Sequence, residues 1–141
     1  MDKVLFSSAS AEWATPPDFF AELDDEFHFT IDPCCTHGNA KCAKHYTAAE
    51  DGLAQDWGGE TVFCNPPYGR AIGSWVKKCW EESQKPGTVV VLLIPSRTDT
   101  AYFHDYILGK AELRFIRGRL KFGGAKCGAP FPSLLAVYGN R

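Results

Sequence analysis

TVVVLLI, at residues 88–94, is a continuous β-prone run that has no polar residue after Thr88, and Pro95 follows it directly. Such a run is typical of a strand covered on both faces, as in a parallel sheet between layers of helices. Pro95 has no backbone N–H and is expected to end the strand. The segment therefore predicts a buried strand of an α/β sheet.

Strand and helix patterns alternate on both sides of this run. Helices are expected from Pro16-Pro17-Asp18, where proline is tolerated in a first turn, around Trp75, and over residues 101–108. Short β-prone runs predict further strands at residues 27–31, 61–64, 113–116, 120–122 and 134–138. This alternation predicts a three-layer α/β fold.

Composition indicates one globular unit. The 141 residues are 45% hydrophobic and 23% charged, and no linker or internal repeat divides them, so residues 1–141 are expected to form a single domain. No apolar stretch reaches the ~18 residues of a membrane-spanning helix, and the N-terminus lacks a signal-peptide pattern. These features predict a cytosolic protein with no membrane partner and with reduced cysteines.

Charge is divided unevenly along the chain, although the net charge is only −2. Residues 1–60 hold three Lys or Arg and twelve Asp or Glu, whereas residues 61–141 hold twelve Lys or Arg and five Asp or Glu. A basic half points toward a polyanionic partner, and it is equally compatible with charges on solvated surfaces.

Three predicted strands lead into polar sequences that contain proline, namely Asp32-Pro33, Asn65-Pro66-Pro67-Tyr68 and Pro95-Ser96-Arg97. Ligands of α/β sheets bind beyond the carboxyl ends of the strands. We therefore expect the three loops to face one crevice.

The tetrapeptide NPPY, residues 65–68, carries the clearest chemistry. Its prolines fix a turn and offer carbonyl acceptors without N–H donors, while Asn65 adds a side-chain oxygen and Tyr68 a flat ring. Two acceptors and a ring suit a planar amino group on an aromatic base. The candidate catalytic residues are therefore Asn65, Pro66, Pro67 and Tyr68, and a plain rigid turn is the alternative.

The segment FCNPPY resembles the catalytic motif of amino-methylating, S-adenosylmethionine-dependent methyltransferases, and the whole chain resembles the small phage-type DNA N6-adenine methyltransferases (Dam-like). The blocks that carry the resemblance are EWATPPDFFAEL (12–23), FTIDPCCTHGNAKC (29–42), FCNPPYGRAIGSW (63–75), LLIPSRTDTAYFHDYI (92–107) and IRGRLKFGGAKCGAPFPSLLAVY (116–138). NPPY is shared with N4-cytosine, RNA and glutamine methyltransferases, so it specifies the reaction better than the acceptor.

The resemblance implies a compact Rossmann-like methyltransferase fold, with a mostly parallel sheet whose later strands are antiparallel. It implies methyl transfer from S-adenosylmethionine to the N6 amino group of adenine in DNA, with the target base flipped into the NPPY site. It also implies a cytoplasmic setting in a bacterial host of a phage or prophage.

The resemblance further implies a cofactor site built from several segments. An acid and a glycine loop would hold the methionine part and ribose, an acid-aromatic pair would lie near the adenine, and an N-terminal motif would close over the methionine end. The corresponding residues are Asp32, Pro33, Gly38 and Asn39, then Asp56 and Trp57, then Trp13, Thr15 and Pro16, together with Asn65.

A ribose-binding acid is harder to assign. Only seventeen residues separate Gly38 from Asp56, which leaves little room for the usual second strand, so Glu50 or Asp51 is expected to substitute. Near Gly38, Lys41 is a further candidate for the cofactor loop.

Basic residues follow two of the later strands. Phosphate contacts that hold a distorted duplex are expected from Arg97, Arg117, Arg119 and Lys121, with Tyr68 binding the base. An exposed strand face that only keeps the protein soluble is the alternative.

No separate target-recognition domain is expected, so the loop at 121–132 is the candidate for recognition of the DNA sequence, with low or short-site specificity. Monomer and homodimer both remain open.

Other function classes remain as alternatives. Cys34, Cys35, His37, Cys42 and His45 fall within twelve residues, as in a zinc module, but no C-x2-C pair completes a tetrahedral site, so no metal is expected. A non-catalytic nucleic-acid-binding relative is the second alternative. An amino methyltransferase acting on RNA, cytosine N4 or protein glutamine is the third.

Overall fold

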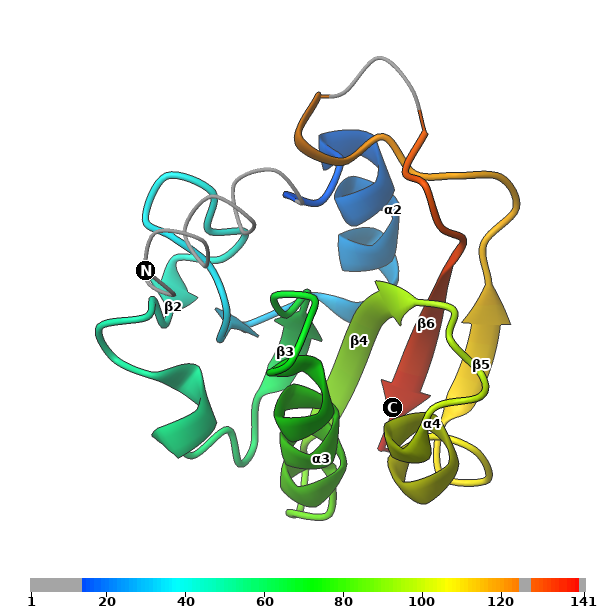
Figure 1. The fold of residues 1–141 in the computed structure, drawn as a ribbon. Helices are drawn as coiled ribbons and strands as arrows, with labels where there is room; N and C mark the ends of the chain where they lie inside the picture. Colours follow the sequence, from blue (N-terminus) through cyan, green and yellow to red (C-terminus); the bar gives the residue numbers. More distant parts are fainter. Residues whose placement is uncertain (1–13, 125–127, 140–141) are drawn as a thin grey trace.

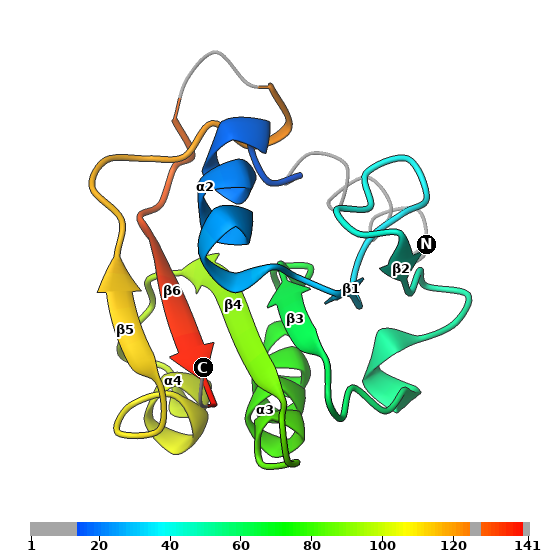
Figure 2. The same ribbon diagram turned by 180° about the vertical axis from the view of Figure 1, so that it is seen from behind.

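A six-stranded sheet lies between helices in the computed structural model, which describes residues 14–124 and 128–139 (Figure 1, Figure 2). Helix α2 covers one face of the sheet, and α3 and α4 cover the other. The elements in chain order are α2 (Pro17–Phe27), β1 (Ile31–Asp32), β2 (Lys44–His45), the 3-10 turn η1 (Gly52–Ala54), β3 (Thr61–Cys64), α3 (Ile72–Ser83), β4 (Val89–Pro95), α4 (Ala101–Tyr106), β5 (Glu112–Phe115), the turn η2 (Phe122–Gly124) and β6 (Ser133–Tyr138). The predicted α/β class is confirmed.

The strand order is β2-β1-β3-β4-β6-β5. The first four of these strands are parallel, and β6 is antiparallel to both of its neighbours, which confirms a mostly parallel sheet with antiparallel pairing among the later strands. Because β5 is antiparallel to β6, it runs in the same direction as β4. The ends of β1, β3, β4 and β5 therefore lie at one border of the sheet, which we call the carboxyl edge.

Strand β4 is the centre of the core, as its sequence predicts. All seven of its residues are buried, and it pairs with β3 on one side and with β6 on the other. Its side chains alternate between two hydrophobic clusters, one beneath α2 and one beneath α3 and α4. This two-sided burial explains why the run contains no polar residue after Thr88.

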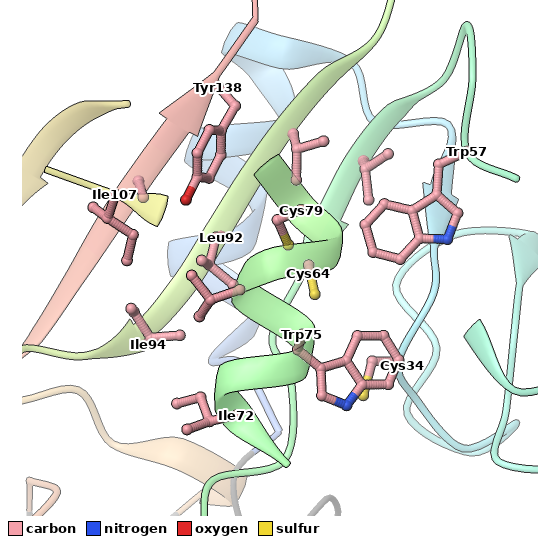
Figure 3. Packing of buried hydrophobic residues seen from close by; sticks show 14 of the residues in the cluster. Cys34, Trp57, Cys64, Ile72, Trp75, Cys79, Leu92, Ile94, Ile107 and Tyr138 are labelled. Atoms are coloured by element: carbon pink, nitrogen blue, oxygen red, sulfur yellow. The ribbon is translucent and has the colours of Figure 1, made fainter. Parts of the chain in front are cut away.

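Helix α3 packs through one apolar face. Ile72, Trp75, Val76 and Cys79 recur at the spacing of a helix turn and are all buried. Figure 3 shows Trp75 beside Cys34 of the β1 loop, and the thiol of Cys79 close to that of Cys64 on β3. The helix therefore anchors the strands whose ends form the site described below.

The strand predicted at residues 27–31 is wrong over most of its length. Phe27 is the last residue of α2, and His28 ends the helix in a left-handed conformation with φ 58°. Asp24 stabilises this end, because its carbonyl accepts the N–H of His28 at 2.8 Å and its Oδ1 accepts that of Phe29 at 2.9 Å. Strand pairing consequently begins only at Ile31.

The strand predicted at residues 120–122 is also wrong. Phe122 begins the turn η2, and the N–H of Gly123 donates to the carbonyl of Ala14 at 2.9 Å. The N–H of Ala129 donates back to the carbonyl of Leu120 at 2.8 Å. This segment is therefore a folded loop that contacts the chain just before α2 instead of extending the sheet.

A short second strand is present where the sequence leaves little room for one. β2 pairs in parallel with β1, with Lys44 opposite Ile31 and His45 opposite Asp32. Two residues thus suffice to continue the sheet beyond β1. In the part of the chain that the structure describes, no helix has the length and apolar character needed to cross a membrane.

Candidate active site

Asn65 follows β3 at the carboxyl edge, and its side chain is held between two hydroxyl groups. Its Nδ2 donates to Oγ1 of Thr15 at 3.0 Å, and the hydroxyl of Tyr68 donates to its Oδ1, also at 3.0 Å. Thr15 is buried, with 3% of its surface exposed. These contacts join the N-terminal segment to the NPPY turn and hold the carboxamide in place.

A polar cleft opens beside Asn65, at the ends of β1 and β3. It is lined by Ala14, Thr15, Asp32, Cys34, Cys35, Asn39, Lys41, Phe63, Asn65, Pro66 and Pro67. The structure therefore brings the β1 loop and the NPPY turn to one site, as predicted. Arg97 and its neighbours after β4 are not among these lining residues, so only two of the three predicted loops form the cleft.

Asp32 is the buried carboxylate of this cleft, with 3% of its surface exposed. Its Oδ1 accepts the N–H of Cys34 at 3.3 Å and its Oδ2 that of Lys41 at 3.0 Å, so the β1 loop is folded around it. Burial raises the pKa of Asp32 to about 6, although the two backbone hydrogen bonds and the charges of His45 and Lys41 act in the opposite direction.

An apolar pocket adjoins the cleft and shares Cys34 and Cys35 with it. Its walls are Pro33, Cys34, Cys35, Thr47, Ala48, Asp51, Gly52, Leu53, Ala71 and Trp75. Asp51 lies in this wall, whereas Glu50 accepts the N–H and hydroxyl hydrogens of Thr47. Of the two acids expected to bind ribose, only Asp51 is positioned at a cavity.

Gly52 allows this pocket to form, although no motif in the sequence distinguishes it from the other glycines. A Cβ at position 52 would lie 2.0 Å from the carbonyl oxygen of Pro33. Only glycine therefore lets the β2–η1 segment approach the β1 loop so closely. At Gly38, by contrast, a Cβ would meet nothing nearer than 3.8 Å, so the packing of the chain does not require glycine there.

Tyr68 belongs to an aromatic cluster at the same edge. Its ring meets those of Phe131 and Phe122 edge-on, with centroid separations of 5.5 and 6.4 Å. Burial raises the pKa of Tyr68 well above its ordinary value, so its hydroxyl remains protonated and can donate to Asn65. Sequence reasoning missed Phe122 and Phe131 as site residues, and the only signal for them is their place in the glycine-rich loop.

Asp56 and Trp57 do not line either cavity, unlike the acid-aromatic pair that the resemblance implies. Trp57 is fully buried, donates its indole N–H to the carbonyl of Gly52 at 3.0 Å, and packs against Trp75 (Figure 3). The exposed Asp56 accepts a hydrogen bond from Nζ of Lys85 at 2.8 Å. Trp57 thus belongs to the hydrophobic core, and Asp56 to an ion pair at the surface.

The remaining cofactor candidates are dispersed. Pro33 lines the apolar pocket, and Pro16 directly precedes α2, where its carbonyl accepts the N–H of Phe20 at 3.0 Å. Trp13 lies outside the described residues.

The predicted phosphate-binding residues lie near the carboxyl edge and are exposed. Arg97 follows β4, and Arg117, Arg119 and Lys121 follow β5. Arg119 also donates to the carbonyl of Ala129 at 3.1 Å. None of these four residues lines the cleft, although Lys121 directly precedes Phe122, whose ring contacts that of Tyr68.

The Cys and His residues of the β1–β2 region do not assemble a metal site. Nδ1 of His37 and Nε2 of His45 lie 2.9 Å apart, and the Cys35 thiol donates to the carbonyls of Asp32 and Tyr46. Within residues 14–124 and 128–139, no group of three or more His, Cys, Asp or Glu side chains could hold a metal ion.

Comparison with known proteins gives two matches. The family model described as DNA N-6-adenine-methyltransferase (Dam) matches residues 5–133. Over 64 residues, the chain is 38% identical to YfdM of Escherichia coli (strain K12), a protein named as a candidate methyltransferase. This alignment covers 40% of the chain and 70% of that relative.

Proposed function

The chain belongs to the Dam family of DNA N-6-adenine-methyltransferases, and from this premise we propose that it methylates the N6 amino group of adenine in DNA, using S-adenosylmethionine. The observation that carries the proposal is the carboxamide of Asn65, held by two hydroxyls beside a cleft that contains a buried carboxylate. A turn with a purely structural role would not account for the polar groups that surround this cleft.

We assign the two ends of the cofactor to the two cavities by the chemistry of their lining residues. Asp32 is a suitable partner for an ammonium group, because its carboxylate is desolvated in the polar cleft. The pocket between Leu53 and Trp75 suits a flat adenine ring, and Asp51 at its wall suits ribose hydroxyls. Bound there, S-adenosylmethionine would supply an electrophilic methyl group.

On the substrate side, positioning is the main task of the protein. The lone pair of an aromatic amino group is delocalised into the ring, so the amine is a poor nucleophile. Asn65 Oδ1 and the carbonyl of Pro66 would accept its two hydrogens, which stabilises the nitrogen as positive charge develops on it. Tyr68 would contact the ring of the flipped base, beside Phe131.

The direct test is to incubate the purified protein with adenine-containing duplex DNA and S-adenosylmethionine, and to identify the modified nucleoside by mass spectrometry. We expect N6-methyladenine. Asn65→Ala should lower the rate at least ~100-fold with little change in cofactor affinity, as removal of one preorganised contact does. N4-methylcytosine, or methylation only of RNA or protein glutamine, would refute the adenine assignment. Wild-type activity in Asn65→Ala would refute the role of the NPPY turn.

A further inference from the structure

We propose that Thr15 is a positioning residue that holds the carboxamide of Asn65 in its working orientation. This inference rests on the proposed function, because it concerns the same amino-binding residue. It gives Thr15 a role different from the cofactor contact that the family resemblance implies.

The contact has the features of a fixed interaction. Oγ1 of Thr15 accepts Nδ2 of Asn65 at 3.0 Å across fifty positions of sequence. Thr15 is buried, so water does not compete strongly for this bond. The hydrogen bond therefore restrains the side chain of Asn65, unlike a solvent-exposed contact at the protein surface.

Asn65 needs such a restraint. The terminal torsion of an asparagine side chain has a broad, shallow preference, so the carboxamide turns easily unless partners hold it. Thr15 binds one end and the Tyr68 hydroxyl the other, which defines the plane of the amide.

The backbone around Thr15 is itself held in place. The carbonyl of Ala14 accepts the N–H of Gly123, and Phe122 beside it contacts the ring of Tyr68. Residues 14–15 thus touch the turn η2, which packs on Tyr68, and also Asn65. This closed set of contacts fixes the position of Oγ1 relative to the NPPY turn.

A positioning role and a cofactor role differ in their kinetic effects. Loss of a cofactor contact raises the dissociation constant of the cofactor. Loss of a restraint on Asn65 lowers the rate of the chemical step while the affinities for cofactor and DNA change little.

Thr15→Val removes Oγ1 at nearly constant shape, and Thr15→Ser keeps it. We expect Thr15→Val to slow single-turnover methylation about 10- to 100-fold, with cofactor and DNA affinities within about threefold of wild type. Thr15→Ser should recover most of the rate. An unchanged rate in Thr15→Val, or a loss matched by weaker S-adenosylmethionine binding in calorimetry, would overturn the proposal.

An activity-independent measurement separates this inference from the proposed function. The side-chain amide resonances of Asn65, assigned through Asn65→Ala, should exchange with water faster in Thr15→Val than in wild type or Thr15→Ser. Tyr68→Phe removes the second restraint and should also accelerate exchange. If no nucleic acid is methylated, this protection still tests the Thr15 contact, and equal exchange in Thr15→Val and wild type would contradict it.

Discussion

Asp32 combines burial with a charge-binding role, and this combination predicts a pH dependence of cofactor binding. Its pKa is raised from 3.8 to about 6 in the free protein, so the carboxyl group takes up a proton as the pH falls through about 6. A cofactor with a positive charge favours the ionised form and should expel that proton. We expect affinity for S-adenosylmethionine to fall below about pH 6, by up to about tenfold per pH unit, as measured by calorimetry.

Asp32→Asn is the matched variant, since it keeps one acceptor for the folded loop and removes the charge. Its affinity should be weaker by about 1 to 3 kcal/mol at pH 7.5 and nearly independent of pH below 6. His45→Gln separates the contribution of the nearby histidine. A wild-type affinity that stays constant from pH 7.5 to 5 would exclude Asp32 as the charge partner.

Stability of the free protein should depend on pH in the opposite sense. Because the folded-state pKa of Asp32 is raised, its contribution to stability is complete below about pH 4 and is lost as the pH rises through about 6. Chemical denaturation of wild type and Asp32→Asn should show this difference, with the variant lacking the loss. Equal pH profiles for the two proteins would show that burial does not destabilise the ionised carboxylate of Asp32, and would contradict this prediction.

At the level of elements, the close approach of η1 to the β1 loop predicts unequal effects of two glycine substitutions. Gly52→Ala places a Cβ against the carbonyl of Pro33 and should lower the free energy of unfolding by about 1 to 3 kcal/mol and weaken cofactor binding. Gly38→Ala, in the loop after β1, has room for its Cβ and serves as the control. Thermal unfolding and calorimetry check both, and equal behaviour of the two variants would contradict this account of the pocket.

Elements with strong local patterns could be predicted from the sequence. β3 and β4 are apolar over most or all of their length, and α3 repeats its apolar face at helical spacing. The end of α2 and the turn η2 could not be predicted from the sequence, because specific hydrogen bonds determine the conformation of both segments. The alternation around Phe27 favours a strand although the Asp24 cap keeps this residue in the helix, and η2 depends on the carbonyl of Ala14, more than a hundred residues away.

In the candidate site, too, features set by local sequence could be predicted, whereas features set by tertiary contacts could not. Asn65 directly follows a strand and Asp32 ends one, so their place at the carboxyl edge could be inferred from sequence. Trp57 could not be distinguished from a ligand-binding aromatic, because its burial depends on Trp75 and on the carbonyl of Gly52. Phe131 reaches Tyr68 only through the folded loop.

For the whole molecule, the exposed cations near the carboxyl edge predict salt-dependent DNA binding. Removing one phosphate-binding cation should flatten the slope of log affinity against log salt by about one, so Arg117→Ala and Lys121→Ala should each do so. Lys110, which precedes β5 at the opposite border of the sheet, is the matched control. Fluorescence anisotropy over a salt series measures the slopes. An equal effect of Lys110→Ala would show that only overall charge matters, and salt-independent binding would exclude this surface.

The position of β6 between β4 and β5 also has a consequence for biosynthesis. β6 follows both neighbours in the chain, so a nascent polypeptide emerging from the ribosome cannot complete the sheet when β4 or β5 appears. At about 5 to 20 residues per second, translation of residues 96–132 leaves the apolar border of β4 without its partner for roughly 2 to 7 s. The strand that organises the finished core is thus a segment that chaperones are expected to protect during synthesis.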